Sequence, residues 1–275
     1  MREPNFSEFQ LQQAINSAYI RHVFETEGDW MFAHVPSLID EHDLGWDSAF
    51  YFPWLRHLPH SYYNGCNFFI QYKLSGQLTS SGAKEWECWN EEYFRFKIPH
   101  STKDAAGKFF DDYHQWDCLK KLANQRYPTF YATNSTLSKD ELQKSTKAGT
   151  LLDETPLLDV RSVKARHKHV TFTNASESFL LHSDVEEVPQ KPFRNLFSTL
   201  LEEGSISFEK STKDIFDSLS EMDGNNEEWR NDLSRIANAP RAVPRDLQTW
   251  RKYVLLISFV RKHIGAELLW YPDNR

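Results

Sequence analysis

Two polar residues, Gln71 and Lys73, lie two positions apart in the otherwise apolar run from Phe68 to Leu74. If this run is a β-strand, alternation places both polar side chains on one face and the apolar side chains on the other. A polar pair inside a buried strand is either hydrogen-bonded within the protein or lines a cleft where it takes part in chemistry. The ordinary alternative is an antiparallel strand whose polar face meets solvent.

An acidic residue, Asp47, stands near the start of an earlier apolar run, residues 46–54. This run also alternates in the manner of a strand, so Asp47 shares one face with Ala49 and Tyr51. A site built from both runs requires Asp47, Gln71 and Lys73 to converge within a few ångströms.

The elements that must position these residues can be predicted from capping and periodicity. Ser7 and Gln10 fit a capping box at the start of a helix over residues 8–26. Further strands are expected at 31–39, 46–54, 65–74, 93–98 (exposed), 129–133, 157–163, 169–173 and 179–181, and helices at 108–125 and from 137. Gln115 and His114 on the helix over 108–125 either line the cleft or pack at the core edge.

The character of the chain changes near Gln190, and helical spacing then predominates at 193–203, 212–222, 227–237 and 244–264. We therefore expect two regions, residues 1–190 and a helical region, 191–275. The segment 244–264 is apolar over so broad an arc that it must be buried in its own domain or against a protein partner or second copy.

Composition narrows the classes of protein. The 275 residues carry a net charge of −7, which gives no general attraction to a phosphate backbone. The three cysteines, Cys66, Cys88 and Cys118, have no close pairing and fit reduced intracellular thiols. No signal peptide opens the chain, and its longest apolar run, Val254–Val260, is too short to span a bilayer. A cytoplasmic protein without a membrane partner is the expectation.

The predicted order of elements resembles that of the PD-(D/E)XK nuclease superfamily. This order is a helix, a strand, the strand with Asp47, the strand with Gln71-x-Lys73, a helix and a strand. The resemblance is closest to the Mrr-like restriction endonucleases, in which glutamine replaces the usual acidic residue of the last motif. The matching segments are Gly45-Trp46-Asp47, Phe69-Ile70-Gln71-Tyr72-Lys73 and Phe130-Tyr131-Ala132-Thr133-Asn134. The resemblance implies an α/β (α+β) fold with a restriction-endonuclease-like mixed sheet flanked by helices, over about residues 8–160.

The resemblance also implies a function, metal-dependent hydrolysis of DNA, with Mg²⁺ or Mn²⁺ as cofactor. Asp47, the Gln71 amide oxygen and the Tyr72 backbone carbonyl would hold the metal. Lys73 would orient or deprotonate the attacking water and stabilise developing charge. Glu8 is the candidate for the glutamate that the first helix often supplies, although the helix dipole alone explains an acid in a first turn.

Several alternatives stay open at this stage. The chain could be an effector or subunit of a bacterial defence system, an RNase on the same scaffold, or a catalytically silent subunit that docks through its C-terminal helices. The histidine cluster of His167, His169 and His182 lacks an evident third metal ligand and fits a surface strand or phosphate contact better. No pattern supports Cys66 or Cys118 as a nucleophile, and no glycine-rich phosphate loop is present.

Overall fold

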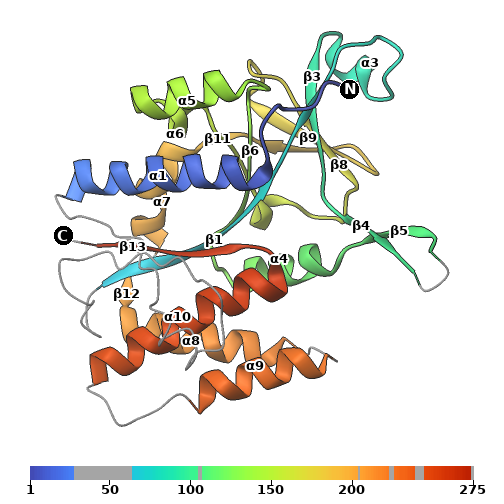
Figure 1. Ribbon diagram of the computed structural model, residues 1–275. Helices are drawn as coiled ribbons and strands as arrows, with labels where there is room; N and C mark the ends of the chain where they lie inside the picture. Colours follow the sequence, from blue (N-terminus) through green and yellow to red (C-terminus); the bar gives the residue numbers. More distant parts are fainter. Residues whose placement is uncertain (28–63, 105–106, 204, 223–225, 239–244, 274–275) are drawn as a thin grey trace. The chain divides into compact units, whose positions relative to one another are not determined.

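The computed structural model describes residues 1–27, 64–104, 107–203, 205–222, 226–238 and 245–273 (Figure 1). The chain divides into two compact units. The first holds residues 1–19 and 69–198, and the second holds the described parts of 20–68 and 199–275. The predicted helical region from residue 191 thus falls mostly in the second unit, which also takes in an earlier part of the chain.

A mixed sheet in the first unit carries the polar pair. Strand β1 (Asn64–Lys73) runs parallel to β6 (Thr129–Thr133) over Phe69 to Lys73, and β6 pairs antiparallel with β7 (Pro156–Asp159), which pairs with β11 (Lys191–Pro192). The predicted strands at 65–74 and 129–133 are confirmed, as is a mixed sheet flanked by helices. Both strands are apolar runs buried along their length, as parallel strands usually are.

A second, antiparallel sheet has the order β10 (Glu186–Pro189), β9 (Ser178–His182), β8 (His169–Phe172), β3 (Tyr93–Lys97) and β2 (Gly76–Leu78). The prediction that the strand at 93–98 is exposed is wrong. β3 pairs with β2 on one side and β8 on the other, so Phe94 stacks on Phe172 at a centroid distance of 5.3 Å and is buried. Phe94 and Phe96 form a buried face, and on the other face Tyr93 is buried while Arg95 and Lys97 are partly buried.

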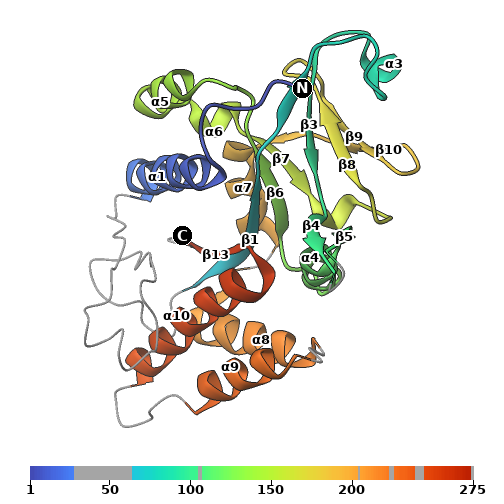
Figure 2. The same cartoon turned by 45° about the vertical axis from the view of Figure 1, so that its right-hand side comes forward.

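Helix α1 (Glu8–Glu27) begins at the predicted capping box. The Gln10 backbone N–H donates to Ser7 Oγ at 3.2 Å, and the Ser7 N–H donates to Gln10 Oε1 at 2.9 Å. The part of α1 in the first unit meets the sheet through Asn16, whose Oδ1 accepts a 2.7 Å hydrogen bond from the Tyr72 hydroxyl. Helix α1 therefore covers the face of β1 opposite to Gln71 and Lys73 (Figure 2).

The helix predicted over 108–125 starts later than expected. Its first part is strand β5 (Phe109–Asp112), paired with β4 (His100–Lys103) in a hairpin, and α4 (His114–Asn124) follows. The Asp112 carboxylate accepts a 2.9 Å hydrogen bond from the His114 N–H, which separates strand from helix. Phe109 and Phe110 fit the apolar spacing of α4 by chance, and both are exposed.

Shorter elements complete the first unit: α3 (Trp86–Trp89), α5 (Lys139–Ala148), α6 (Leu151–Glu154), η1 (Val160–Ser162), η2 (Phe193–Asn195) and the start of α7 (Leu196–Glu203). The serine cap predicted for the helix after residue 137 is confirmed, since Ser138 Oγ accepts from the Glu141 N–H. The strand predicted at 157–163 ends early, because Asp159 Oδ1 accepts from the Arg161 N–H and starts the turn of η1.

The second unit contains β12 (Ile206–Ser207), α8 (Phe208–Glu221), α9 (Glu227–Ala237), α10 (Arg245–Ile264) and β13 (Glu267–Pro272). The helices predicted at 212–222, 227–237 and 244–264 are confirmed, whereas the buried strand β13 was missed. Strands β12 and β13 both pair with β1, and a Cβ at Gly65 would lie 2.4 Å from the Tyr271 carbonyl oxygen. Glycine is thus required where β13 approaches β1.

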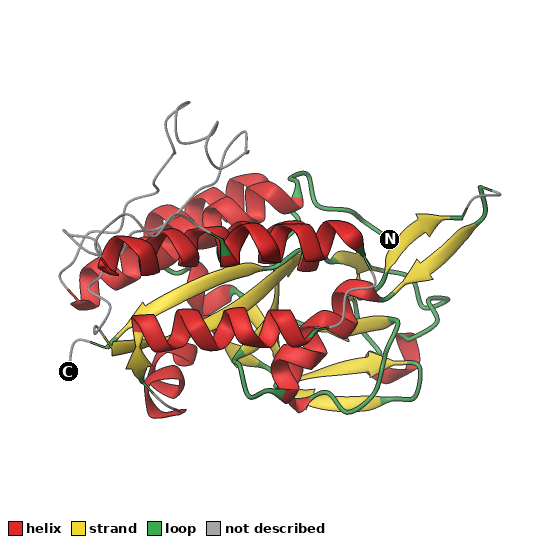
Figure 3. Cartoon of the chain, turned by 90° about the horizontal axis from the view of Figure 1, so that it is seen from below, coloured by secondary structure: helices red, strands yellow, loops and turns green. Residues whose placement is uncertain are grey.

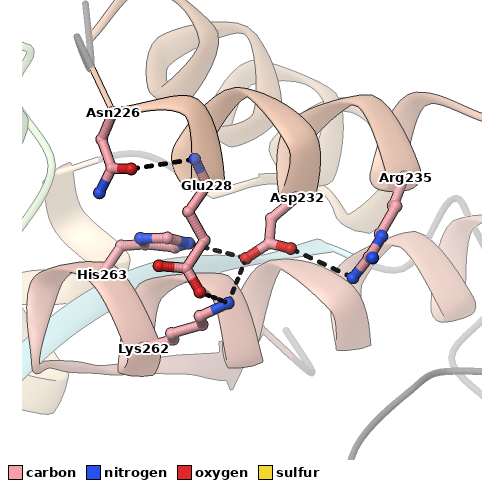
Figure 4. A network of polar contacts seen from close by, with 6 residues as sticks. All are labelled: Asn226, Glu228, Asp232, Arg235, Lys262 and His263. Carbon is pink, nitrogen blue, oxygen red and sulfur yellow. Dashed lines mark hydrogen bonds and ion pairs between the residues drawn. The ribbon is translucent and has the colours of Figure 1, made fainter.

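An ion-pair network joins α9 to α10 (Figure 4). Asp232 accepts from Lys262 Nζ at 2.7 Å and from His263 Nε2 at 2.9 Å, and Lys262 also pairs with Glu228 at 2.8 Å. Burial alone would raise the pKa of Asp232, but the hydrogen bonds from Lys262 and His263 outweigh it and hold that pKa below its usual value.

The apolar arc of α10 is covered within its own unit. Tyr253, Leu256 and Val260 are fully buried, and α10 packs on α8, α9 and β13. In the described part of the chain, every helix is too short or too polar to cross a lipid bilayer.

Candidate active site

Gln71 and Lys73 lie side by side on one face of β1, and both are buried. Their exposed fractions are 3% and 6%, so the alternative of a solvent-facing polar strand is wrong. In the parallel register, Gln71 lies opposite Tyr131 on β6 and Lys73 lies opposite Thr133. A buried lysine and a buried amide at neighbouring positions cost free energy unless other groups satisfy them.

Helix α4 covers this face of the sheet. Trp116 stacks on Tyr131 with a centroid distance of 6.2 Å, and Gln115 extends toward Gln71. The Gln115 Oε1 atom accepts a hydrogen bond from Gln71 Nε2 and also contacts His100 Nε2. Gln71 Oε1 is buried and has no hydrogen-bond partner among the described residues. It is therefore a buried acceptor whose hydrogen-bonding capacity is unused by the described residues.

Lys73 Nζ lies 3.0 Å from Nε2 of His100, and His100 is the first residue of β4. Burial lowers the pKa of Lys73 to about 8, although the nearby negative charge of Glu8 raises it in part. Burial and then the positive charge of Lys73 lower the pKa of His100, so its imidazole is neutral at pH 7. In a neutral imidazole, Nε2 either bears a proton, which it can donate to Gln115 Oε1, or has a lone pair, which can accept from Lys73 Nζ. It cannot do both at once, so the two contacts depend on the same tautomer.

Glu8 joins the cluster from the first turn of α1. The residue is exposed as a whole, but burial of its carboxyl group raises its pKa, against the opposing effects of Lys73 and of a hydrogen bond from the Leu74 N–H. The carboxylate thus lies beside the end of β1 that carries Lys73. Of the predicted site residues, the structure brings Glu8, Gln71 and Lys73 together.

The carboxyl ends of β1 and β6 are locked to each other beyond the site. The Ser75 N–H donates to Asn134 Oδ1 at 2.8 Å, and Asn134 Nδ2 donates to the Ser75 carbonyl at 2.9 Å. Thr133 Oγ1 donates to the Lys73 carbonyl at 2.8 Å. Because all these groups are buried, they hold the backbone that carries Lys73.

Other predicted residues fall elsewhere. Asp47, with the strands predicted at 31–39 and 46–54, lies outside the described residues. The Tyr72 hydroxyl bonds Asn16 on the opposite face, which leaves only its backbone carbonyl for the predicted role. His100 was missed, because an isolated histidine after a proline carries no sequence signal. For Gln115 the sequence leaves open a cleft or packing at the core edge, and the structure places its side chain against Gln71 and His100.

Oxygen donors suited to Mg²⁺ are present in the cluster, namely the free Gln71 Oε1 and the Glu8 carboxylate. Among the described residues, no three histidine, cysteine, aspartate or glutamate side chains gather to hold a metal ion. The described donors therefore fit a hard cation in part, and Asp47 would supply the anionic oxygen that the resemblance implies.

The remaining candidates have structural roles. His167 Nε2 contacts Glu186 at 2.8 Å, and His182 Nε2 contacts Thr171 at 2.7 Å, so the histidine cluster is divided among separate partners. Burial raises the pKa of the Cys118 thiol to about 11, which keeps it protonated at neutral pH.

Comparisons with profiles of known protein families, with curated proteins and with solved structures found no match for this chain. The assignment of function therefore rests on the chemistry of the described residues.

Proposed function

We propose that this protein is a metal-dependent nuclease that hydrolyses phosphodiester bonds of DNA. The observation that carries the proposal is the burial of Lys73, with a pKa lowered to about 8, beside Glu8, Gln71 and His100. Lysines with lowered pKa values gather at catalytic sites because a group that changes protonation near the working pH can exchange protons with a reactant.

Lys73 is the proposed group for proton exchange and charge stabilisation. With a pKa of about 8, roughly one Lys73 side chain in ten is neutral at pH 7 and can accept a proton from water. The ammonium form can instead donate to a phosphate oxygen. His100, at 3.0 Å from Lys73 Nζ, holds the amine in place and offers a second site for the proton.

Gln71 and Glu8 are the proposed metal ligands from the described residues, together with Asp47 and the Tyr72 carbonyl. A bound Mg²⁺ would offset negative charge at the scissile phosphate. Gln115 fixes the Gln71 amide by accepting from its Nε2, which leaves the buried Oε1 without a hydrogen-bond partner among the described residues.

The arrangement of elements supports the restriction-endonuclease-like fold within this proposal. After β1, which carries Gln71 and Lys73, the chain forms β2, α3, β3, β4 and β5 before helix α4. Strand β6 follows α4 directly and lies parallel and adjacent to β1. Helix α1 supplies an acid at the same end of β1. The negative net charge fits an effector or subunit of a larger assembly, such as a bacterial defence system, that brings the protein to its substrate.

The test is cleavage of supercoiled plasmid, single-stranded DNA and RNA with Mg²⁺ or Mn²⁺. We expect metal-dependent cleavage of DNA by the parent and a loss of about 100- to 10,000-fold in Lys73→Ala. Lys121→Ala, at an exposed position of α4, is the matched control and should retain activity. Cleavage of RNA alone would favour the RNase alternative. Equal activity in the parent and Lys73→Ala would refute the assignment of the active site to Lys73. An inactive parent would favour the alternative of a catalytically silent interaction subunit.

A further inference from the structure

The hairpin of β4 and β5 starts at the candidate site and carries two exposed aromatic residues. His100, which contacts Lys73, is the first residue of β4, and the hairpin extends from there away from the other strands of its unit (Figures 1 and 3). The exposed fractions of Phe109 and Phe110 are 65% and 47%. Singly exposed apolar residues are common on protein surfaces, so a binding role for either ring depends on where it lies relative to His100.

The register of the hairpin separates the two rings. His100 pairs with Asp112, and Thr102 pairs with Phe110. Since paired residues share a face and alternate positions along a strand return to it, Phe110 stands on the same face as His100, two residues further along. That spacing corresponds to about 7 Å along the strand.

Phe109 lies on the other face, which is occupied by contacts within the protein. Lys103 Nζ lies 4.9 Å from the centroid of the Phe109 ring, and Asp111 pairs with both Lys97 and Lys168, at 2.5 and 2.7 Å. In the part of the chain that the structure describes, no ring or cation packs on Phe110. Phe109 is the more exposed ring and has Lys103 beside it, whereas Phe110 is the ring that shares a face with His100.

The hairpin over residues 100–112 carries two lysines and three aspartates, and Asp112 stands opposite His100 on the site face, so its attraction to a phosphate is local to one lysine. Lys103 and Lys108 are exposed toward its outer end, while Asp104 is engaged through its Oδ1 with the Lys108 backbone N–H at 2.8 Å. Lys103 lies on the face of Phe109. Lys108 continues the register opposite Asp104, on the face of Phe110, so its ammonium group can contact a phosphate while a base meets the Phe110 ring. A duplex keeps its bases stacked on one another, so a single exposed ring on a narrow hairpin fits an unpaired base.

We propose that Phe110 is a stacking platform for an unpaired base of the substrate strand, next to the nucleotide whose phosphate lies at Lys73. The substrate class is then single-stranded or locally unpaired nucleic acid. This inference rests on the proposed nuclease function and deepens it. Phe110 positions the strand, whereas Gln71 and Lys73 act on it.

The test is binding of a short fluorescein-labelled oligothymidine to the full-length chain, measured by fluorescence anisotropy with EDTA present so that no metal-dependent cleavage occurs. Phe110→Ala should weaken binding by about five- to a hundredfold, the range for loss of one base–aromatic stack. Phe110→Trp should restore binding, because every large aromatic ring can stack on a base. Phe109→Ala, on the opposite face of the same hairpin, is the matched control and should change binding less than twofold.

The outcomes separate this inference from the proposed function. Equal affinity of the parent and Phe110→Ala, or a loss confined to Phe109→Ala, would overturn the role of Phe110. Tighter binding of the parent to a blunt duplex than to oligothymidine would overturn the substrate class. In each of these cases, metal-dependent plasmid cleavage that is lost in Lys73→Ala would leave the nuclease function standing.

Discussion

Replacing Lys73 by methionine should make the protein more stable at neutral pH, although it removes a hydrogen bond to His100. The reason is the lowered pKa. The ammonium form of Lys73 is favoured in the unfolded chain, where the pKa is near 10.5, and disfavoured in the folded protein, where it is about 8. With about 1.4 kcal/mol for each pKa unit, burial of the charged form costs about 3 kcal/mol below pH 8.

The sign of the pH dependence follows from proton binding. Between pH 8 and 10.5 the unfolded chain holds more protons at this position than the folded protein, so parent stability rises with pH over this window. Lys73→Met does not titrate. Its stability advantage should therefore approach about 3 kcal/mol at pH 7, as an upper value, and disappear as the pH rises toward 10.5.

The assay is urea unfolding of both proteins at several pH values from 6 to 10.5, followed by tryptophan fluorescence, with the free energy of unfolding compared at each pH. The difference between parent and variant cancels the titration of the shared groups that do not interact with Lys73, whereas Glu8 and His100, whose pKa values Lys73 shifts, contribute to it. Lys121→Met, exposed on α4, should differ from the parent by less than about 0.5 kcal/mol at every pH. A Lys73→Met protein that is less stable than the parent at pH 7, or a difference that stays constant with pH, would refute the placement of a buried, easily deprotonated lysine.

Two further predictions concern the supports of the two units. Asn134→Ala should lower the free energy of unfolding by about 2 to 4 kcal/mol, because it leaves the fully buried N–H and carbonyl of Ser75 without partners. Asn134→Asp should lower it by less, because the aspartate keeps the acceptor for the Ser75 N–H. The urea midpoints of both variants measure these changes. Asp232→Asn should cost about 1 to 2 kcal/mol at pH 7, since it removes the charge paired with Lys262 and His263. Because the folded-state pKa of Asp232 lies below 3.8, this cost should shrink as the pH falls from about 5 toward that pKa, and a pH-independent cost in thermal melts would contradict the network.

The sequence by itself determined the local features. The capping residues Ser7 and Ser138 fixed where α1 and α5 begin, because a cap involves only atoms a few residues apart. Alternation in β1 was enough to place Gln71 and Lys73 on one face. The same local patterns failed for Phe109 and Phe110, whose spacing fits a helix as well as it fits a hairpin.

Tertiary structure alone decided the contacts between distant segments. His100 lies 27 residues beyond Lys73 and meets it only because the β4–β5 hairpin begins beside the end of β1. Gln115 reaches Gln71 because α4 packs over the sheet through Trp116. Burial of Lys73, and with it the lowered pKa, depends on all these elements together, since desolvation is a property of the assembled surroundings. A strand pattern can place a lysine on one face of a sheet, but whether that face is buried from solvent depends on the packing of the whole fold.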